Sequence, residues 1–355
     1  MGQLRVFDES SHQNLVEIES HGLVILFPVT RVGEQAVKKW QQIVKLCNDS
    51  QIAGLVVIDK TPDQDARKFF YSQQFEQNHN VWIIMRPSTE AIYDSQKYIK
   101  ISPNSWIIQL HDDDEWDGSL RLLGGGQELA AFQVQFYVGS KLKYSKSKNY
   151  DELPARVNFT LIPSLVWNRF TSFIESQSGH IAGSADATLN MVVRDVCSLS
   201  NNMEFIYYYN IRHWRNNRAG KLHLTQLSRE DGWKQFSSPE IAVINRTIDN
   251  LAALSYFSNL YNREKLAAGI LRELKTFEIN ALKRNLLSYQ IGLLSIGFRR
   301  DRKELLMQLM KASDIKSIPD VIAWLKNLPY LPLLESRKIF WINEMRKLEN
   351  LNQVV

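Results

Sequence analysis

Four short apolar runs in the first third of the chain limit its fold more than any other feature. The runs are LVILFPV at 23–29, AGLVVID at 53–59, VWIIMR at 81–86 and WIIQL at 106–110. Apolar runs of roughly four to eight residues without polar alternation are typical of strands buried on both faces of a sheet. The segments between them have the apolar spacing of amphipathic helices, at 32–47, 66–78 and 88–101. This alternation predicts an α/β fold with a mostly parallel sheet covered by helices.

The pattern of elements changes after about residue 120. Strand patterns recur at 128–139, 155–163 and 202–210, and a lysine-rich segment at 141–152 reads as a solvated loop. Helical patterns cover 164–177 and the end of a Gly/Ser-rich stretch at 178–198. After Pro239 only helical patterns remain. We therefore predict two domains, an α/β domain at 1–238 and an α-helical C-terminal domain at 239–355.

The net charge of +5 is concentrated in the C-terminal part of the chain. Residues 1–240 contain 25 Lys and Arg against 27 Asp and Glu, whereas residues 241–355 contain 18 against 11. The two cysteines, Cys47 and Cys197, exclude a disulfide framework and a cysteine-built zinc site. The N-terminus has no signal-peptide pattern and no run of about 18 apolar residues occurs. These features predict a cytoplasmic protein, either free or peripheral at the inner membrane.

The segment WIIQLHDDDEWDG at 106–118 carries the strongest functional signal. An apolar strand pattern ends at His111 and is followed by five acidic residues, Asp112, Asp113, Asp114, Glu115 and Asp117. Carboxylates held this close repel one another unless a cation or solvent screens them. Ligands in open parallel sheets lie beyond the carboxyl ends of the strands, and oxygen ligands suit Mg²⁺ or Mn²⁺. The run is therefore a predicted metal site, and a solvated acidic loop is the alternative.

At this point the chain resembles the GT-A fold of nucleotide-sugar glycosyltransferases, over about residues 20–215. The resemblance rests on the strand order ending in HDDDEW, which matches a D-x-D cluster, and on the segments SADATLN and YYYNIRHW. The nearest likeness is to inverting, family-2-like bacterial transferases of surface polysaccharide. It implies a Rossmann-like sheet, an Mn²⁺ or Mg²⁺ cofactor, a UDP-sugar or related donor, and a glycan or lipid-linked acceptor.

The resemblance also implies roles for individual residues. The nucleotide would lie against a segment after the first strand, Pro28, Val29, Thr30 and Arg31, and against Asp59 at the end of the second. The alternatives are a turn or cap role for Asp59 and a surface position for Arg31. Asp112 would contact the ribose and, with Asp114, form the D-x-D at the metal, while Asp113 could replace either one. His111 occupies the first position of the family's usual D-x-D-D pattern, so the ribose contact departs from it.

A second group of candidates follows in the chain. Asp186 is the predicted base that accepts the proton of the acceptor hydroxyl, with helix capping as its alternative role. His213 is a predicted ligand of the metal or diphosphate, or else a structural histidine. Arg215 and Arg218 lie in a basic loop suited to the diphosphate oxygens, unless that loop is simply solvated.

The basic segment at 280–303 combines apolar positions with six Lys and Arg residues. It could meet anionic lipid, or pack within the helical domain or a homodimer. Nucleic acid is not an expected partner, because aromatic residues are not interleaved with the basic ones.

Two rival functions remain open. A nucleotidyltransferase also combines an α/β sheet with acidic metal ligands, but the segment FPVTRVGEQ at 27–35 lacks its usual glycine-rich phosphate loop. A non-catalytic helical scaffold with a degenerate GT-A domain is the other alternative.

Overall fold

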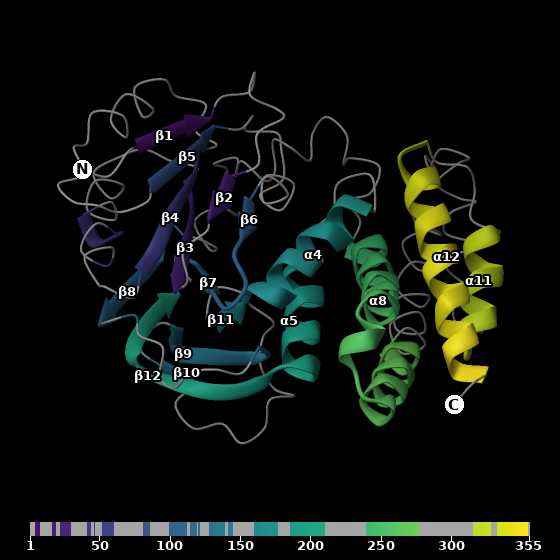
Figure 1. The fold of residues 1–355 in the computed structure, drawn as a ribbon. Helices are drawn as coiled ribbons and strands as arrows, with labels where there is room; N and C mark the ends of the chain where they lie inside the picture. The colour runs from purple at the N-terminus through teal and green to yellow at the C-terminus, as the bar shows by residue number, and fades with distance from the viewer. Residues whose placement is uncertain are drawn as a thin grey trace, which may run out of the picture. The chain divides into compact units, whose positions relative to one another are not determined.

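The computed structural model describes about half of the chain. The described residues are 4–7, 16–18, 22–29, 41–43, 46, 52–59, 81–85, 99–111, 114–118, 120, 128–138, 141–144, 160–176, 185–209, 239–276, 315–327 and 332–353. They form two compact units (Figure 1). The first unit contains residues 1–172 and 197–234, and the second contains 173–196 and 235–355.

One half of the main sheet of the first unit is parallel. Its strands, in spatial order, are β1 (Leu4–Phe7), β5 (Val81–Met85), β4 (Ile52–Asp59), β3 (Leu23–Val29) and β7 (Trp106–Gln109). Each pairs in parallel with its neighbour. All seven residues of β3 are buried, which explains why its sequence shows no polar alternation. The four strands predicted from continuous apolar runs are confirmed.

The other half of the sheet is mixed. Its strands continue from β7 in the order β11 (Thr160–Pro163), β9 (Ala130–Val138), β12 (Ser198–Tyr209) and β8 (Glu115–Gly118), with β10 (Lys141–Tyr144) paired to β9. β9 and β12 pair in parallel, whereas β11 and β8 run antiparallel to their neighbours. The α/β class with a mostly parallel, mixed sheet is therefore confirmed, as are the strands expected near 128–139, 155–163 and 202–210.

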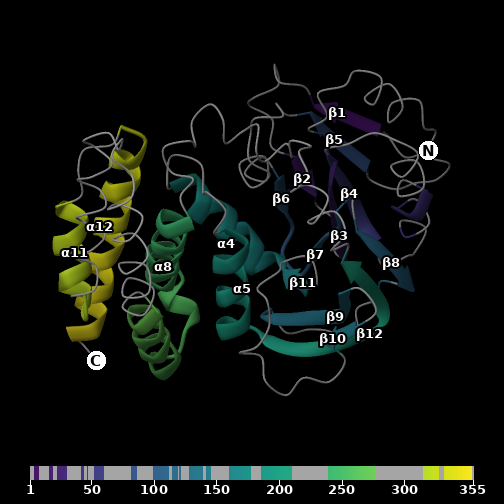
Figure 2. The same cartoon turned by 180° about the vertical axis from the view of Figure 1, so that it is seen from behind.

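Two local predictions are wrong. Residues Ile99–Ile101, expected at the end of a helix, form β6, which pairs in parallel with β2 (Val16–Ile18) in a separate sheet (Figure 2). Lys141–Tyr144, expected in a solvated loop, pairs with the end of β9 as β10. In both cases a strand partner distant in sequence, or across a hairpin, outweighs the local preference. The helix predicted at 66–78 lies outside the described residues, and of the one at 32–47 residues 41–43 and 46 are helical.

Helices make up the described part of the second unit. They are α5 (Ala185–Val196), α8 (Pro239–Tyr256), a helix at 263–276, α11 (Ile318–Lys326) and α12 (Pro332–Gln353). α8 packs against α5 and α12, and α12 packs against α11. The helix α4 (Ser164–Ser176) ends in this unit, where Phe173 contacts the rings of Tyr256, Phe257 and Phe340. The predicted C-terminal helices are confirmed over the described residues.

The compact units divide the chain differently from the predicted domains in one respect. Residues 173–196, which include α5, belong with the C-terminal helices rather than with the sheet. The boundaries 1–238 and 239–355 stay a prediction. None of the helices among the described residues is both long and apolar enough to cross a membrane.

Candidate functional site

The carboxyl ends of the central parallel strands lie at one edge of the sheet. Val29 at the end of β3 pairs with Asp59 at the end of β4, and Asp59 pairs in turn with Met85 of β5. On the other side of β3, Gln109 of β7 is level with Leu26, and the Leu110 amide donates to the Leu26 carbonyl oxygen at 2.9 Å. The residues after β7 therefore continue at the edge where β3 and β4 end.

The acidic run connects β7 to β8 at this edge. The Asp114 amide donates a 3.4 Å hydrogen bond to the His111 carbonyl oxygen. The Asp114 side chain is 1% exposed, whereas Glu115 and Asp117, in β8, are exposed. Asp114 therefore differs in burial from Glu115 and Asp117. Asp112 and Asp113 lie outside the described residues.

A short hydrogen bond joins Gln109 to His111 directly after β7. Gln109 Nε2 and His111 Nε2 are 2.7 Å apart, and Gln109 is 2% exposed. The arrangement holds His111 against the end of β7.

β8 returns beside β3 although it lies at the far end of the sheet's strand order. The ring of Trp116 meets the ring of Phe27 edge to face, with centroids 6.2 Å apart. Phe27 is 1% exposed and Trp116 is 5% exposed. Figures 1 and 2 both draw β8 near β3 and β4. This contact joins β8 to β3.

The predicted nucleotide-binding segment begins inside β3. Pro28 and Val29 are buried strand residues, and Thr30 and Arg31 lie outside the described residues. The backbone of Asp59 is placed at the end of β4, as the sequence predicted, but its side chain is outside the described part of the structure. The structure thus brings the ends of β3, β4 and β7 together, and the binding roles stay predictions.

Asp186 is the second residue of α5, in the second compact unit. A carboxylate in the first turn of a helix is favoured by the exposed backbone amides there, so its place suits a capping role as well as that of a base. Its side chain is outside the described residues, as are His213, Arg215, Arg218 and the basic segment at 280–303.

Of the three predicted metal ligands, the structure describes only Asp114. Among the described residues, no group of three or more His, Cys, Asp or Glu side chains could hold a metal ion. Asp114 is a buried carboxyl group of the kind that Mg²⁺ and Mn²⁺ accept, and the other predicted ligands, Asp112 and His213, are not described.

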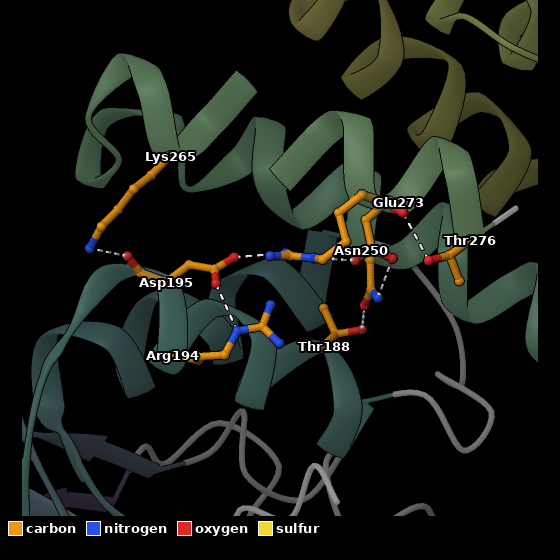
Figure 3. A network of polar contacts seen from close by, with 8 residues as sticks. Thr188, Arg194, Asp195, Asn250, Lys265, Glu273 and Thr276 are labelled. Carbon is orange, nitrogen blue, oxygen red and sulfur yellow. Dashed lines mark hydrogen bonds and ion pairs between the residues drawn. The ribbon is translucent and has the colours of Figure 1, made fainter. Parts of the chain in front are cut away.

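Sequence reasoning missed a polar network inside the second unit (Figure 3). Its hydrogen bonds join α5 to α8 and to the helix at 263–276. The members are Thr188, Arg194, Asp195, Asn250, Lys265, Arg272, Glu273 and Thr276. They come from segments separated by up to 77 residues, so no local spacing could have indicated them.

Charge and burial shift two pKa values around this network. Burial lowers the pKa of the Arg272 guanidinium, but the hydrogen bond and charge of Asp195 outweigh it, so the pKa is raised. Burial raises the pKa of the Tyr261 phenol well above its ordinary value, and the charge of Asp195 raises it further. Both groups therefore keep their usual protonation at neutral pH.

A pocket of about 310 Å³ lies on α11 and α12, remote in sequence from the predicted site residues. It is lined by Pro319, Ile322, Ala323, Lys326, Asn327 and Glu349. Its lining offers one cation, Lys326, and one carboxylate, Glu349, so it gives no reason to move the candidate site from the sheet edge.

Comparison with known proteins found no matching family model, and no curated protein matches the sequence. Several solved structures are similar at 10% sequence identity. The crystal structure of S. aureus TarS 1–349 has a TM-score of 0.38, covering 76% of this chain and 92% of that one. TarS 1–349 in complex with UDP-GlcNAc has a TM-score of 0.39, covering 94% and 92%, and a further TarS structure has 0.38, covering 76% and 53%. At this identity and these TM-scores, the similarities assign the chain to no family and to no activity.

Proposed function

We propose that this protein is a metal-dependent glycosyltransferase. It moves a sugar from a nucleoside-diphosphate sugar, preferably a UDP-sugar, to a glycan or lipid-linked acceptor of bacterial surface polysaccharide. The observation that supports this best is the buried carboxyl group of Asp114, which follows β7 at the edge where β3 and β4 end. Parallel sheets bind ligands at this edge, and acidic side chains there suit a metal ion and ribose hydroxyls.

The proposed reaction is a single displacement with inversion. The acceptor hydroxyl oxygen bonds to the anomeric carbon, the bond from that carbon to the diphosphate breaks, and the electron pair leaves on the diphosphate oxygen. Asp186 accepts the proton of the acceptor hydroxyl. Asp112 and Asp114 would hold Mn²⁺ or Mg²⁺, which would neutralise the charge of the departing diphosphate.

The remaining predicted residues orient the donor in this proposal. Pro28, Val29, Thr30 and Arg31 would lie along the nucleotide, and Asp59 and Asp113 would contact the base or ribose. Arg215 and Arg218 would meet the diphosphate oxygens, with His213 as a further ligand of the metal or diphosphate.

Calorimetric titration of nucleotides tests the donor site. The probes are UDP and UDP-GlcNAc, followed by GDP-, CMP- and dTDP-sugars, each with and without Mn²⁺. We expect Mn²⁺-dependent binding that Asp114→Asn and Asp112→Asn each weaken about tenfold or more, because each removes a charged ligand of the metal. Glu115→Gln is the matched control, since Glu115 is adjacent, acidic and exposed.

Equal binding by all three variants would rule out the metal site. Absence of any nucleotide binding would instead favour a non-catalytic scaffold. Product analysis distinguishes a glycosyltransferase from a nucleotidyltransferase. Sugar transfer from a nucleoside-diphosphate sugar releases a nucleoside diphosphate, whereas nucleotidyl transfer from a nucleoside triphosphate releases pyrophosphate.

A further inference from the structure

The helix α5 is held near both of its ends by hydrogen bonds to other helices of the second unit. Thr188, in its first turn, bonds to α8, and Asp195, in its last turn, bonds to the helix at 263–276 (Figure 3). These anchors are seven residues apart, which is about two helical turns, so both lie on one face of α5. Two anchors on one face fix both the rotation of the helix and its position along its axis.

The first anchor is a chain of two buried hydrogen bonds. Thr188 Oγ1 donates to Asn250 Oδ1 at 2.8 Å, and Asn250 Nδ2 donates to Glu273 Oε2 at 2.8 Å. Thr188 is 1% exposed, and Asn250 and Glu273 are each 5% exposed. Hydrogen bonds in such surroundings are strong, and a broken one leaves a buried polar group without a partner.

The second anchor is ionic and starts from the same glutamate. Arg272 Nε donates to Glu273 Oε1 at 3.2 Å, and Arg272 Nη2 donates to Asp195 Oδ2 at 2.8 Å. Asp195 Oδ1 accepts from Arg194 Nε at 2.8 Å. Two cations and two carboxylates therefore balance, and the contacts close a ring from the start of α5 to its end.

Close helix packing allows these short bonds. A Cβ atom at Gly269 would lie 3.0 Å from Leu254 Cδ2, so glycine lets the helix at 263–276 approach α8. The side chains of Asn250 and Glu273 then meet across this contact without a gap. The first anchor therefore joins three helices, α5, α8 and the helix at 263–276, through buried side chains.

We propose that Thr188, Asn250 and Glu273 are positioning residues that hold Asp186 in place for proton transfer. This inference rests on the proposed function, in which Asp186 is the base. Asp186 lies two residues before Thr188 in the same first turn of α5. A base must stay within hydrogen-bonding distance of the acceptor hydroxyl, and a shift of about 1 Å can reduce the rate a hundredfold.

The variants Thr188→Val and Thr188→Ser test the role, with sugar transfer and donor binding measured on the full-length protein. Thr188→Val keeps the shape of the side chain but removes its hydroxyl, and we expect kcat to fall about tenfold with the KM for the donor unchanged. Thr188→Ser restores the hydroxyl and should return kcat to within about twofold of wild type. Each kcat is therefore expressed per donor-binding molecule, counted from the stoichiometry of donor binding, so that a loss of folded protein does not imitate the effect.

The double variant Asp186→Asn/Thr188→Val separates positioning from a general structural effect. Asp186→Asn alone should lower kcat about a hundredfold, as expected for loss of a general base. If Thr188 acts only through Asp186, Thr188→Val should cause no further loss in that background. A further tenfold loss there would overturn the positioning role, as would an unchanged kcat of Thr188→Val in the wild-type background.

Failure of the proposed function has a different signature. Wild-type protein that binds no nucleotide sugar and transfers none would overturn both inferences. Active wild-type protein whose turnover is unaffected by Asp186→Asn would remove Asp186 as the base, and with it the positioning role, while leaving the donor site at the sheet edge intact.

Discussion

Trp341 Nε1 of α12 donates a 3.0 Å hydrogen bond to Asp249 Oδ1 of α8. Asp249 is 0% exposed and Trp341 is 1% exposed. The bond therefore joins two helices that are separated by 92 residues in the chain, within the core of the helical unit. An indole nitrogen can only donate, so the position opposite it must offer an acceptor.

The first prediction concerns this acceptor. Asp249→Ala should destabilise the helical unit by about 2 kcal/mol, because it removes the buried hydrogen bond from the indole N–H and creates a small cavity. Asp249→Asn keeps an acceptor oxygen and should cost less than about 1 kcal/mol. Urea unfolding followed by far-UV circular dichroism measures both. A larger loss for Asp249→Asn than for Asp249→Ala would show that charge, and not the hydrogen bond, matters here.

The second prediction concerns the start of α11. Ser317 Oγ accepts from the Asp320 amide at 3.3 Å, and Asp320 Oδ2 accepts from the Ser317 amide at 2.9 Å, which forms a capping box. Ser317→Ala should cost about 1 kcal/mol at neutral pH, whereas Ser317→Thr should cost little. Urea midpoints of the two variants give the comparison, and equal midpoints would contradict the capping role.

This cap should also depend on pH. Hydrogen bonds from Ser317 and from the Lys316 amide hold the pKa of the partly exposed Asp320 below its ordinary value. A lowered pKa in the folded state contributes stability above the unfolded pKa of about 4, and that contribution disappears as pH falls through the folded value. The difference in stability between wild type and Ser317→Ala should therefore shrink in acid. A difference that grows in acid would contradict this assignment.

The sequence was informative where one segment determines its own environment. β3, β4, β5 and β7 were recognisable because strands buried on both faces must be apolar throughout. β8 and β10, with the sequences EWDG and KLKY, carry no such signal, because their pairing is imposed by β12 and β9. Short polar strands of this kind are visible only once the neighbouring strands are placed.

For the candidate site, the sequence likewise predicted positions along the chain but not contacts between distant residues. The position of Asp114 beyond β7 followed from the strand pattern, but its burial and the Phe27–Trp116 contact did not. The Thr188–Asn250–Glu273 chain had no local signature, because its bonds span 62 and 23 residues. Thr and Asn within amphipathic helices look like ordinary half-exposed positions until their partners are known.

The third prediction concerns the ionic side of the network. Arg272→Met removes the cation shared by Asp195 and Glu273, whose side chains are 11% and 7% exposed. Loss of one partner from a buried pair costs roughly 3–5 kcal/mol, but Arg272 is 37% exposed, so we expect about 2 kcal/mol. Lys275→Met, on the exposed face of the same helix, is the control and should change stability by less than about 0.5 kcal/mol. Similar urea midpoints for the two variants would show that the pairs contribute nothing.

The fourth prediction concerns Tyr261, which is 9% exposed and whose buried hydroxyl has no hydrogen-bond partner among the described residues. Tyr261→Phe should stabilise the protein by up to about 1 kcal/mol, because it removes an unsatisfied polar group and keeps the ring. Burial raises the pKa of the phenol, so above a pH of about 10 the phenol ionises in the unfolded chain but not in the folded protein. The stability of wild type should therefore fall above this pH, whereas that of Tyr261→Phe should fall less. Urea midpoints at neutral and alkaline pH measure both effects. A less stable Tyr261→Phe at neutral pH would mean that the hydroxyl is hydrogen-bonded in solution.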